Sequence, residues 1–375
     1  MFIAGDYCPC VRIEQLVQKK DFSFFAEMQE YTAQSDYAIV NFECPVVVGN
    51  VSPIKKCGPA LRTEPNAITS IKSAGFDCVT LANNHFRDYG DEGCFSTINE
   101  LNKQEVDFVG GGENIQKAQQ VLYKEINGCI LAIINFCENE FSIATNNRAG
   151  AAPLDLIDNS RQIQEAKQKA DFVLVIVHGG HEHNQLPSPR MKKTYRYFIE
   201  IGADAVVNCH QHCFSGYEYY LGKPIIYGLG NFCFDRLGKC GDIWNEGYCV
   251  RVQFEKQQNP KIECLPYLQC DEHPTVSFLS RNAKVVFEQK IEVLNSIIAD
   301  DAKLIEKFNE WVVKKTPWWL SIFSSYHNRY LNAAASRGYI PRPASKTELA
   351  ILLNYIGCEA HRDITLAILD KEINK

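Results

Sequence analysis

The chain has 375 residues, of which 46% are hydrophobic and 11% aromatic, so it can bury a large core and is too apolar to be disordered. Its length allows one large domain, or one domain with an appendage. Its formal net charge of −6 at pH 7 argues against nucleic acid as a partner, because a protein that binds the phosphate backbone needs a basic surface.

Short apolar runs alternate with helix-like segments through roughly the first two-thirds of the chain, a pattern that predicts an α/β layered domain. The expected strands are residues 2–5, 37–41, 78–82, 130–135, 172–177, 205–208 and 225–227. Between them, helices are expected at residues 22–32, 65–74, 93–102, 156–170 and 189–201. Glycines such as Gly75 and Gly202 follow several of these helices, as is common at helix C-termini.

The pattern changes after about Gly238. Two more strands are expected at residues 248–254 and 261–266, and the stretch from Ser280 to the C-terminus has an almost wholly helical pattern. No internal repeat or low-complexity linker marks this change. We expect a domain over residues 1–275 and a helical C-terminal extension over residues 276–375, with a boundary that is soft by several residues.

The sixteen cysteines are scattered, and several of them, including Cys78, Cys129 and Cys249, lie in apolar runs where cysteine behaves as a small hydrophobe. This usage favours a reducing compartment over a disulfide framework. The first residues, Met1 to Asp6, contain no basic segment followed by a long apolar stretch. We therefore expect no signal peptide and no membrane anchor, and a cytoplasmic location.

Side chains that can bind a metal follow many of the expected strands. In chain order these side chains are Asp6, Glu43, Asn84, His85, His178, His210 and His212. In an open α/β sheet the ligand crevice lies at the carboxyl ends of the strands, so these side chains are expected to converge. Carboxylates, an amide oxygen and imidazoles form a typical ligand set for Zn, Mn or Fe, and Glu43 has two oxygens with which to bridge two ions. Such a site activates water for attack on a phosphoryl or carbonyl centre.

Each of these residues also has an ordinary structural interpretation. An aspartate after a strand, such as Asp6, is often a turn or cap residue. A surface loop can hold both His210 and His212 without a metal. His178 is followed by two glycines, which leave its imidazole accessible. The metal hypothesis therefore depends on the conjunction of these residues and on no single one of them.

Six segments carry more specific motifs, and they follow one another between Met1 and Asp235. They are Ala4-Gly5-Asp6, residues 39–45 with Asn-Phe-Glu-Cys-Pro, residues 75–85 ending in Ala-Asn-Asn-His and followed by Asp88-Tyr89-Gly90, residues 177–182 (Val-His-Gly-Gly-His-Glu), residues 202–212 ending in His-Gln-His, and residues 227–235 with Leu-Gly-Asn-Phe. In content and order these segments resemble the CapA family of capsule and poly-γ-glutamate biosynthesis proteins, which is itself similar to the calcineurin-like metallophosphoesterases.

The resemblance implies a four-layer fold, in which a two-sheet β sandwich is flanked by helices and a metal centre lies at one edge. It implies one metal held by Asp6, Glu43 and His212, and another held by Glu43, Asn84, His178 and His210. Asp6, Glu43 and His85 become the candidate catalytic residues, with His85 protonating the leaving group or steadying the transition state. Arg62, Glu182 and Asn231 become candidate substrate-binding or supporting residues, and the fork of Arg62 suits a carboxylate or phosphate.

The chain also departs from these relatives. The wider superfamily begins with Asp-x-His, whereas this chain has Asp6-Tyr7-Cys8. The first metal is therefore weakly held, absent, or helped by the thiolate of Cys8, and the number of ions is one or two. Family members are often tethered outside the cell membrane, whereas we expect this chain to form a cytoplasmic branch.

These observations predict a metal-dependent hydrolase of capsule, poly-γ-glutamate or other surface-polymer biosynthesis. Its substrate would be a phosphoester or a γ-glutamyl amide within an anionic polymer or precursor. Two alternatives remain open, a generic metallophosphatase or phosphodiesterase and a non-catalytic scaffold subunit of a polymer-synthesis complex. For the scaffold, the aromatic cluster of Pro317, Trp318, Trp319 and Phe323 is a candidate partner surface, although it can equally pack on the sandwich.

Overall fold

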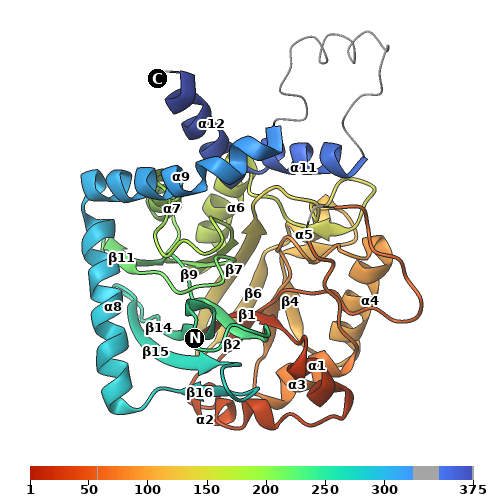
Figure 1. Cartoon of the computed structure of the whole chain (residues 1–375). Coiled ribbons are helices and arrows are strands. Elements are labelled where there is room, and N and C mark those ends of the chain that lie inside the picture. Colours follow the sequence, from red (N-terminus) through yellow and green to blue (C-terminus); the bar gives the residue numbers. More distant parts are fainter. Residues whose placement is uncertain (57, 324–345, 374–375) are drawn as a thin grey trace.

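Two β-sheets pack face to face and carry helices on their outer faces in the computed structural model, which describes residues 1–56, 58–323 and 346–373 (Figure 1). The first sheet has the strand order β16-β15-β14-β1-β2-β3-β4, with β13 also paired to β1. Its strands are β16 (Val276–Phe278), β15 (Lys261–Gln269), β14 (Glu246–Gln253), β1 (Phe2–Cys8), β2 (Ala38–Phe42), β3 (Cys78–Thr80), β4 (Asp107–Val109) and β13 (Asn231–Phe234). Strands β1 to β4 are parallel, and β14 joins β1 in antiparallel orientation.

The second sheet has the order β11-β12-β10-β9-β7-β6. Its strands are β11 (Tyr217–Tyr220), β12 (Lys223–Ile226), β10 (Ala205–Cys209), β9 (Phe172–His178), β7 (Cys129–Cys137) and β6 (Leu122–Ile126). The four central strands are parallel, and each edge strand closes an antiparallel hairpin. A small separate sheet pairs β5 (Gly111–Gly112) with β8 (Gly150–Ala151).

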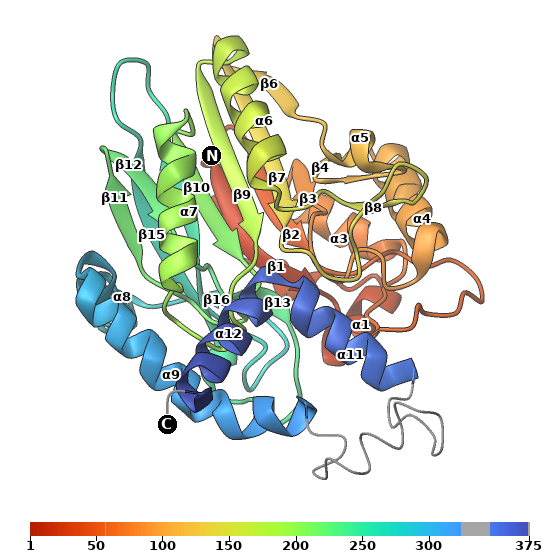
Figure 2. The same ribbon diagram turned by 90° about the horizontal axis from the view of Figure 1, so that it is seen from above.

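Helices cover the outer faces of both sheets (Figure 2). They are α1 (Arg12–Gln18), α2 (Met28–Thr32), α3 (Asn66–Ser73), α4 (Gly90–Lys103) and the short α5 (Ile115–Ala118) in the first half of the chain, and α6 (Leu156–Lys169) and α7 (Pro189–Glu200) against the second sheet. Side-chain caps stabilise the N-termini of α6 and α7. The side chain of Asp155 accepts from the first backbone N–H groups of α6, and Ser188 caps α7, whose first residue is Pro189.

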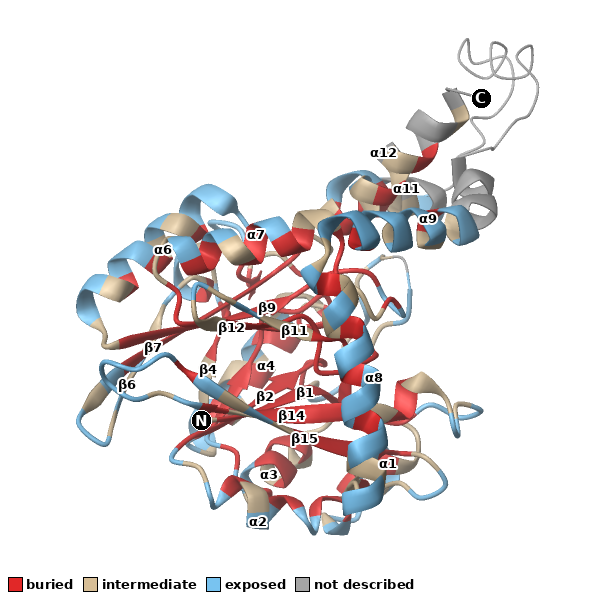
Figure 3. Ribbon diagram, turned by 90° about the vertical axis from the view of Figure 1, so that its left-hand side faces the viewer, coloured by how far each residue is buried: buried red, intermediate tan, exposed pale blue. Residues whose placement is uncertain are grey.

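Central strands such as β1 and β9 are buried on two sides, because each sheet packs against its partner on one face and against helices on the other (Figure 3). On β1, Ile3 lies in a core cluster with Ile39 of β2 and Ile176 of β9, whereas the neighbouring Phe2 and Ala4 belong to a cluster with the helices. The predicted fold class, a two-sheet α/β sandwich flanked by helices, is confirmed.

The structure differs from the expected elements in two respects. The helix expected over residues 22–32 is a 3₁₀ turn at Ser23–Phe25, in which Phe24 and Phe25 are both buried, followed by the short helix α2. Further short elements were not expected, namely the strands β4, β5, β6, β8, β11, β13 and β16 and the helices α1 and α5. Strand β6 lies at a sheet edge with alternating exposed residues, so it carries no long apolar run.

The C-terminal helices are α8 (Arg281–Ala299), α9 (Asp301–Phe323), α11 (Lys346–Gly357) and α12 (Glu359–Ile373). Helix α8 places Phe287, Ile291 and Leu294 in the same core cluster as strand residues of both sheets. Helices α9, α11 and α12 lie across one end of the sandwich (Figures 1 and 2). The boundary near residue 275 stays a prediction.

Two further expectations concern the surface of this region. The side chains of Pro317, Trp318, Trp319 and Phe323 lie outside the described residues, so their proposed role as a partner surface stays a prediction. Within the described part of the chain, no helix is both long and apolar enough to cross a bilayer. The cytoplasmic location also stays a prediction.

Candidate metal centre

The carboxyl ends of five strands deliver the predicted ligands to one edge of the sandwich. Asp6 lies in β1, Glu43 directly follows β2, and Asn84 and His85 come after β3. His178 is the last residue of β9, and His210 and His212 follow β10. The side chains of the six predicted metal ligands are buried. Parallel pairing of β1 with β2 and of β9 with β10 places these ends side by side.

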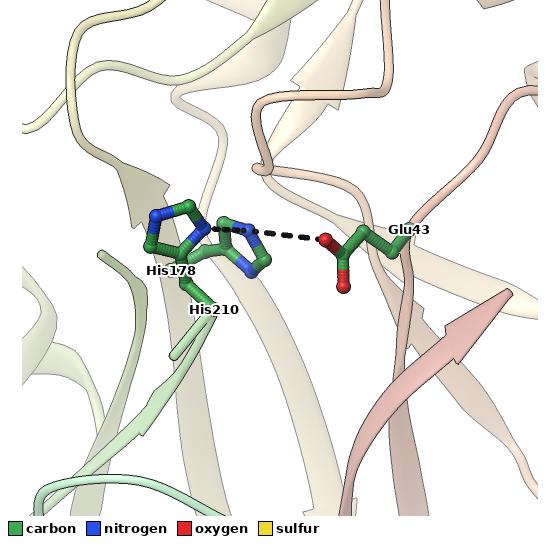
Figure 4. Close-up of side chains that lie close together, drawn as sticks. All are labelled: Glu43, His178 and His210. Carbon is green, nitrogen blue, oxygen red and sulfur yellow. Dashed lines mark hydrogen bonds and ion pairs between the residues drawn. The ribbon is translucent and has the colours of Figure 1, made fainter. Parts of the chain in front are cut away.

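These residues form two overlapping groups whose potential ligand atoms all lie within 4.8 Å of one another. Glu43, His178 and His210 make up the first group (Figure 4). Asp6, Glu43 and His212 make up the second. Glu43 belongs to both groups, as the sequence predicts for a bridging carboxylate.

His178 is the meeting point of the first group. Its Nε2 atom lies 3.0 Å from the Oδ1 atom of Asn84 and 3.0 Å from the Nδ1 atom of His210. The same nitrogen lies 3.9 Å from the Oε1 atom of Glu43. Asn84 therefore joins the group through its carbonyl oxygen, and all four residues predicted to surround one ion are together.

His212 connects the two carboxylates of the second group. Its Nδ1 atom lies 3.7 Å from the Oδ2 atom of Asp6, and its Nε2 atom lies 3.7 Å from the Oε1 atom of Glu43. The Oδ1 atom of Asn231 lies 2.9 Å from the Nδ1 atom of His212 and orients its ring. The three residues predicted to surround the other ion therefore also meet.

The electrostatics of this cluster fit a divalent cation. Glu43 is completely buried, and neither of its carboxylate oxygens has a hydrogen-bond partner among the described residues. Burial, followed by the nearby Asp6 carboxylate, raises the pKa of Glu43 well above its ordinary value. Burial also lowers the pKa of His178 and of His212, so both rings stay neutral and keep a lone pair for a ligand bond. A cation would offset the buried negative charge and satisfy the bare oxygens.

The backbone around these ligands adopts uncommon conformations. His210 has φ 101° and His212 has φ 55°, in the left-handed region that residues with a side chain rarely occupy. A Cβ atom on Gly5 would lie 2.0 Å from the carbonyl oxygen of Gly230, so only glycine allows β1 to approach the β13 segment that carries Asn231.

His85 lies beside the cluster, and a contact with Asp88 holds its ring. Its Nδ1 atom lies 2.7 Å from the Oδ2 atom of Asp88. Asp88 is also fully buried, pairs with Lys56, and accepts a hydrogen bond from the backbone N–H of Leu61. The ring of His85 is therefore fixed while its outer edge borders a cavity shared with Asn84 and His210.

The three predicted substrate-binding residues lie in different surroundings. Glu182 is exposed and lines the cavity. Arg62 is exposed, stacks 5.8 Å above the ring centroid of Tyr89, and is not part of the cavity wall. Asn231 is completely buried behind His212, where it can orient this ring but has no surface to offer a substrate. Only Glu182 thus lies where a substrate-facing residue is needed.

Sequence reasoning missed Asn41, Asp88 and Lys56 as parts of the site. The Nδ2 atom of Asn41 donates to the Oδ1 atom of Asp6 at 2.7 Å, and it lies 3.2 Å from the Nδ1 atom of His178. Asn41 precedes Glu43 by two residues and Asp88 follows His85 by three, spacings that place each pair on one side of a strand or turn. No local signal marks Lys56.

The thiol of Cys8 lies apart from the grouped ligand atoms. It belongs to neither of the two metal-capable groups found among the described residues. Although a hydrogen bond from Cys10 acts in the opposite direction, contact with Cys44 and burial raise the pKa of Cys8 well above its ordinary value. The second group therefore offers one imidazole and two carboxylates.

Comparison with known proteins assigns the family. Residues 1–236 match the family of the bacterial capsule synthesis protein PGA_cap. The chain belongs to this family. The resemblance to CapA proteins that the strand-end motifs indicate is therefore confirmed, and the matched residues of this PGA_cap family member include every predicted site residue.

Two curated relatives carry CapA names. The capsule biosynthesis protein CapA of Bacillus anthracis is 31% identical over 245 residues, which are 63% of this chain and 60% of the relative. The PGA biosynthesis protein CapA of Bacillus subtilis (strain 168) is 32% identical over 236 residues, 62% of each chain. The alignments thus span less than two-thirds of the length of these relatives.

Among solved structures, the chain is similar to a 5′-nucleotidase precursor from Thermus thermophilus. The two are 11% identical with a TM-score of 0.42, and the alignment covers 72% of this chain and 53% of that protein. A similarity this distant does not establish a shared activity.

Proposed function

We propose that this PGA_cap family member is a metal-dependent hydrolase in the biosynthesis of a capsular or poly-γ-glutamate polymer. The observation that carries the proposal is the carboxylate of Glu43, which is completely buried, lacks a hydrogen-bond partner among the described residues, and faces buried imidazoles. The names of the two Bacillus relatives, a capsule and a PGA biosynthesis protein, support the polymer context.

In this proposal Glu43, Asn84, His178 and His210 hold one divalent cation, and Asp6, Glu43 and His212 hold a second. Zn, Mn and Fe all suit this mixture of carboxylate, amide and imidazole ligands. When bound, such a cation would supply an activated water and polarise a phosphoryl or carbonyl oxygen of the substrate.

The remaining residues would orient and move protons. His85, held at its Nδ1 atom by Asp88, would donate a proton from its Nε2 atom to the departing oxygen or nitrogen. Asn41 would hold Asp6, and Asn231 would hold His212, each by hydrogen bonds behind the ligand. Glu182, at the cavity mouth, would contact the substrate.

The metal is tested directly by elemental emission on the purified chain. We expect close to one or two transition-metal ions per chain in the wild type and almost none in the His178→Ala, His210→Ala double variant. A matched control is His273→Ala, which removes an exposed imidazole far along the chain and should keep the full metal content. A metal-free wild type that is folded and active would sink the proposal.

The substrate is tested by comparing a panel of phosphate esters with γ-linked glutamate oligomers. We expect hydrolysis of a γ-glutamyl bond or of a phosphoester attached to a polymer precursor. Turnover of simple phosphate esters alone would favour a generic phosphatase. Full metal content without turnover of any member of the panel would favour a scaffold subunit that keeps the site for binding.

A further inference from the structure

A cavity of about 310 Å³ joins the candidate metal centre to the C-terminal helices. On one side it is lined by Asn84, His85 and His210. On the other it is lined by Trp311 and Lys315 of α9 and by residues of α11 and α12, among them Tyr355 and His361. The volume lies in the range of small-molecule sites. The helices beyond the matched family region therefore form one wall of the pocket that contains the candidate site.

Polar contacts fix this wall relative to the sandwich. Arg190 of α7 pairs with Glu138, which follows β7, and its Nε atom lies 2.6 Å from the Oδ2 atom of Asp363 in α12. Asn139 donates from its side chain to the carboxylate of Glu359 at 2.6 Å. These contacts link helix α7 and the end of β7, the strand paired with β9, to helix α12. The wall is thus held in place beside the metal centre.

A third contact anchors the wall within the cavity lining. The Nε2 atom of His181, three residues after His178, lies 3.1 Å from the carbonyl oxygen of Ala360 in α12. The ring of His181 also lies 5.1 Å from that of Trp311, between ring centroids. Trp311 is therefore positioned by the segment that ends β9, and it presents an aromatic face near the candidate site.

Among the described residues of this wall, Lys315 is a lysine whose ammonium group can still pair with a ligand. Lys56, on the opposite side of the cavity, is already paired with Asp88. Lys315 makes no ion pair with any described residue, and its Nζ atom lies 5.3 Å from the ring centroid of Trp311. The cavity also contains Glu140 and Glu182, so it is not uniformly positive. Because the pocket carries both signs of charge, the position of Lys315 determines where on this wall an anion would bind.

We infer that α9 supplies the distal half of the substrate site, in which Lys315, steadied by Trp311, binds an anionic group of the substrate away from the metal centre. The inference rests on the proposed function and deepens it by naming a substrate class. That class is a ligand with at least two anionic groups, one beside the metal centre and one beside Lys315. A segment of a polyanionic chain meets this requirement. Lys315 acts as a specificity residue and not as a catalytic one.

Equilibrium binding tests this assignment without turnover. The probes are γ-linked tri-glutamate and a neutral counterpart with amidated carboxylates, titrated calorimetrically into the full metal-loaded chain. We expect Lys315→Ala to weaken binding of tri-glutamate about tenfold, the effect of losing one charge-assisted hydrogen bond. Lys315→Arg should restore most of the affinity. The control is Lys314→Ala, a neighbouring exposed lysine outside the cavity wall, which should bind like the wild type.

The outcomes separate this inference from the proposed function. Three results would overturn the role of Lys315. The wild type and Lys315→Ala could bind tri-glutamate with equal affinity, or Lys315→Ala could lose as much affinity for the neutral counterpart as for tri-glutamate. The third result is that tri-glutamate does not bind to the wild type. Weaker binding by Lys315→Ala, in a chain that hydrolyses no member of the substrate panel, would support the anion site while the hydrolase proposal fails. Hydrolysis with an unchanged KM in Lys315→Ala would support the hydrolase proposal while the anion site at Lys315 fails.

Discussion

The Nδ1 atom of His85 lies 2.7 Å from the Oδ2 atom of Asp88, three residues later in the chain. Both side chains are buried, and Asp88 is held in turn by Lys56 and by the backbone N–H of Leu61. The carboxylate therefore fixes the ring of His85 while the outer edge of the ring borders the cavity, the orientation that a proton donor requires.

Asp88→Asn should lower kcat about 10- to 100-fold, because an amide holds the His85 ring less firmly in the orientation for proton donation. The metal content should not change, since Asp88 belongs to neither metal-capable group. Steady-state kinetics on the metal-loaded chain check this, and kcat should fall while KM changes little. The control is Asp91→Asn, whose carboxylate pairs with Arg87 on the surface. A variant with normal kcat would contradict the role of Asp88.

Glu43→Gln should stabilise the metal-free protein near neutral pH. The folded chain holds the pKa of Glu43 above its ordinary value of 4.5, so its ionisation costs stability. This cost is absent below about pH 4.5 and grows as the pH rises toward the folded-state pKa. Glutamine carries no charge, so the difference in stability between variant and wild type should widen over that interval. Thermal unfolding against pH in a chelator checks the prediction.

At saturating metal, the wild type should instead be more stable than Glu43→Gln. Only the wild type then gains the free energy of ion binding, since the variant has lost the carboxylate shared by both groups. Two results would contradict a destabilising ionisation of Glu43. One is a stability difference between the metal-free proteins that stays constant with pH. The other is a metal-free variant that is less stable than the wild type.

Asn231→Ala should weaken metal binding about 10- to 100-fold, because His212 loses the amide that orients its ring. Metal competition with a chromophoric chelator measures the change. Asn147→Ala, at an exposed loop position, should keep the wild-type affinity. Substrate affinity offers a second readout. If Asn231 contacted the substrate directly, the variant would raise KM at full metal occupancy, which its burial behind His212 argues against.

Phe287→Ala should destabilise the protein by about 3–5 kcal/mol, because its ring is buried in the core cluster shared by both sheets. The ring lies 4.5 Å from that of Phe214, between centroids. The neighbouring Val286 is 55% exposed, so Val286→Ala should change stability by less than about 0.5 kcal/mol. Denaturant unfolding measures both. Equal, small effects would show that α8 is an independent appendage.

Local pattern explains why much of the fold was predictable. The run of six apolar residues before His178 has a strand's length and composition, and β9 covers Phe172–His178 as expected apart from one residue at its end. The 3₁₀ turn at Ser23–Phe25 and the edge strand β6 were not predicted, because partners elsewhere in the chain decide them.

Local pattern also identified part of the candidate site, and contacts with distant segments decided the rest. Asp6, Glu43 and His178 could be identified because each ends a recognisable strand, and parallel strands bring their carboxyl ends to one edge. Asn231 was assigned a substrate-binding or supporting role and Arg62 a substrate-binding role, and neither residue lies in the cavity wall. Residue type suggested both roles, but burial and direction decide what a side chain can touch.

By itself, the sequence of this protein determined the alternation of strands and helices and the residue types placed at the strand ends, because periodicity and strand termination are properties of neighbouring residues. Only the tertiary structure decided that Asn41 and Asn231 support the ligands, that Lys56 is already neutralised by Asp88, and that Trp311 and Lys315 border the site. Each of these depends on packing between segments far apart in the chain, and no local pattern encodes a contact of that kind.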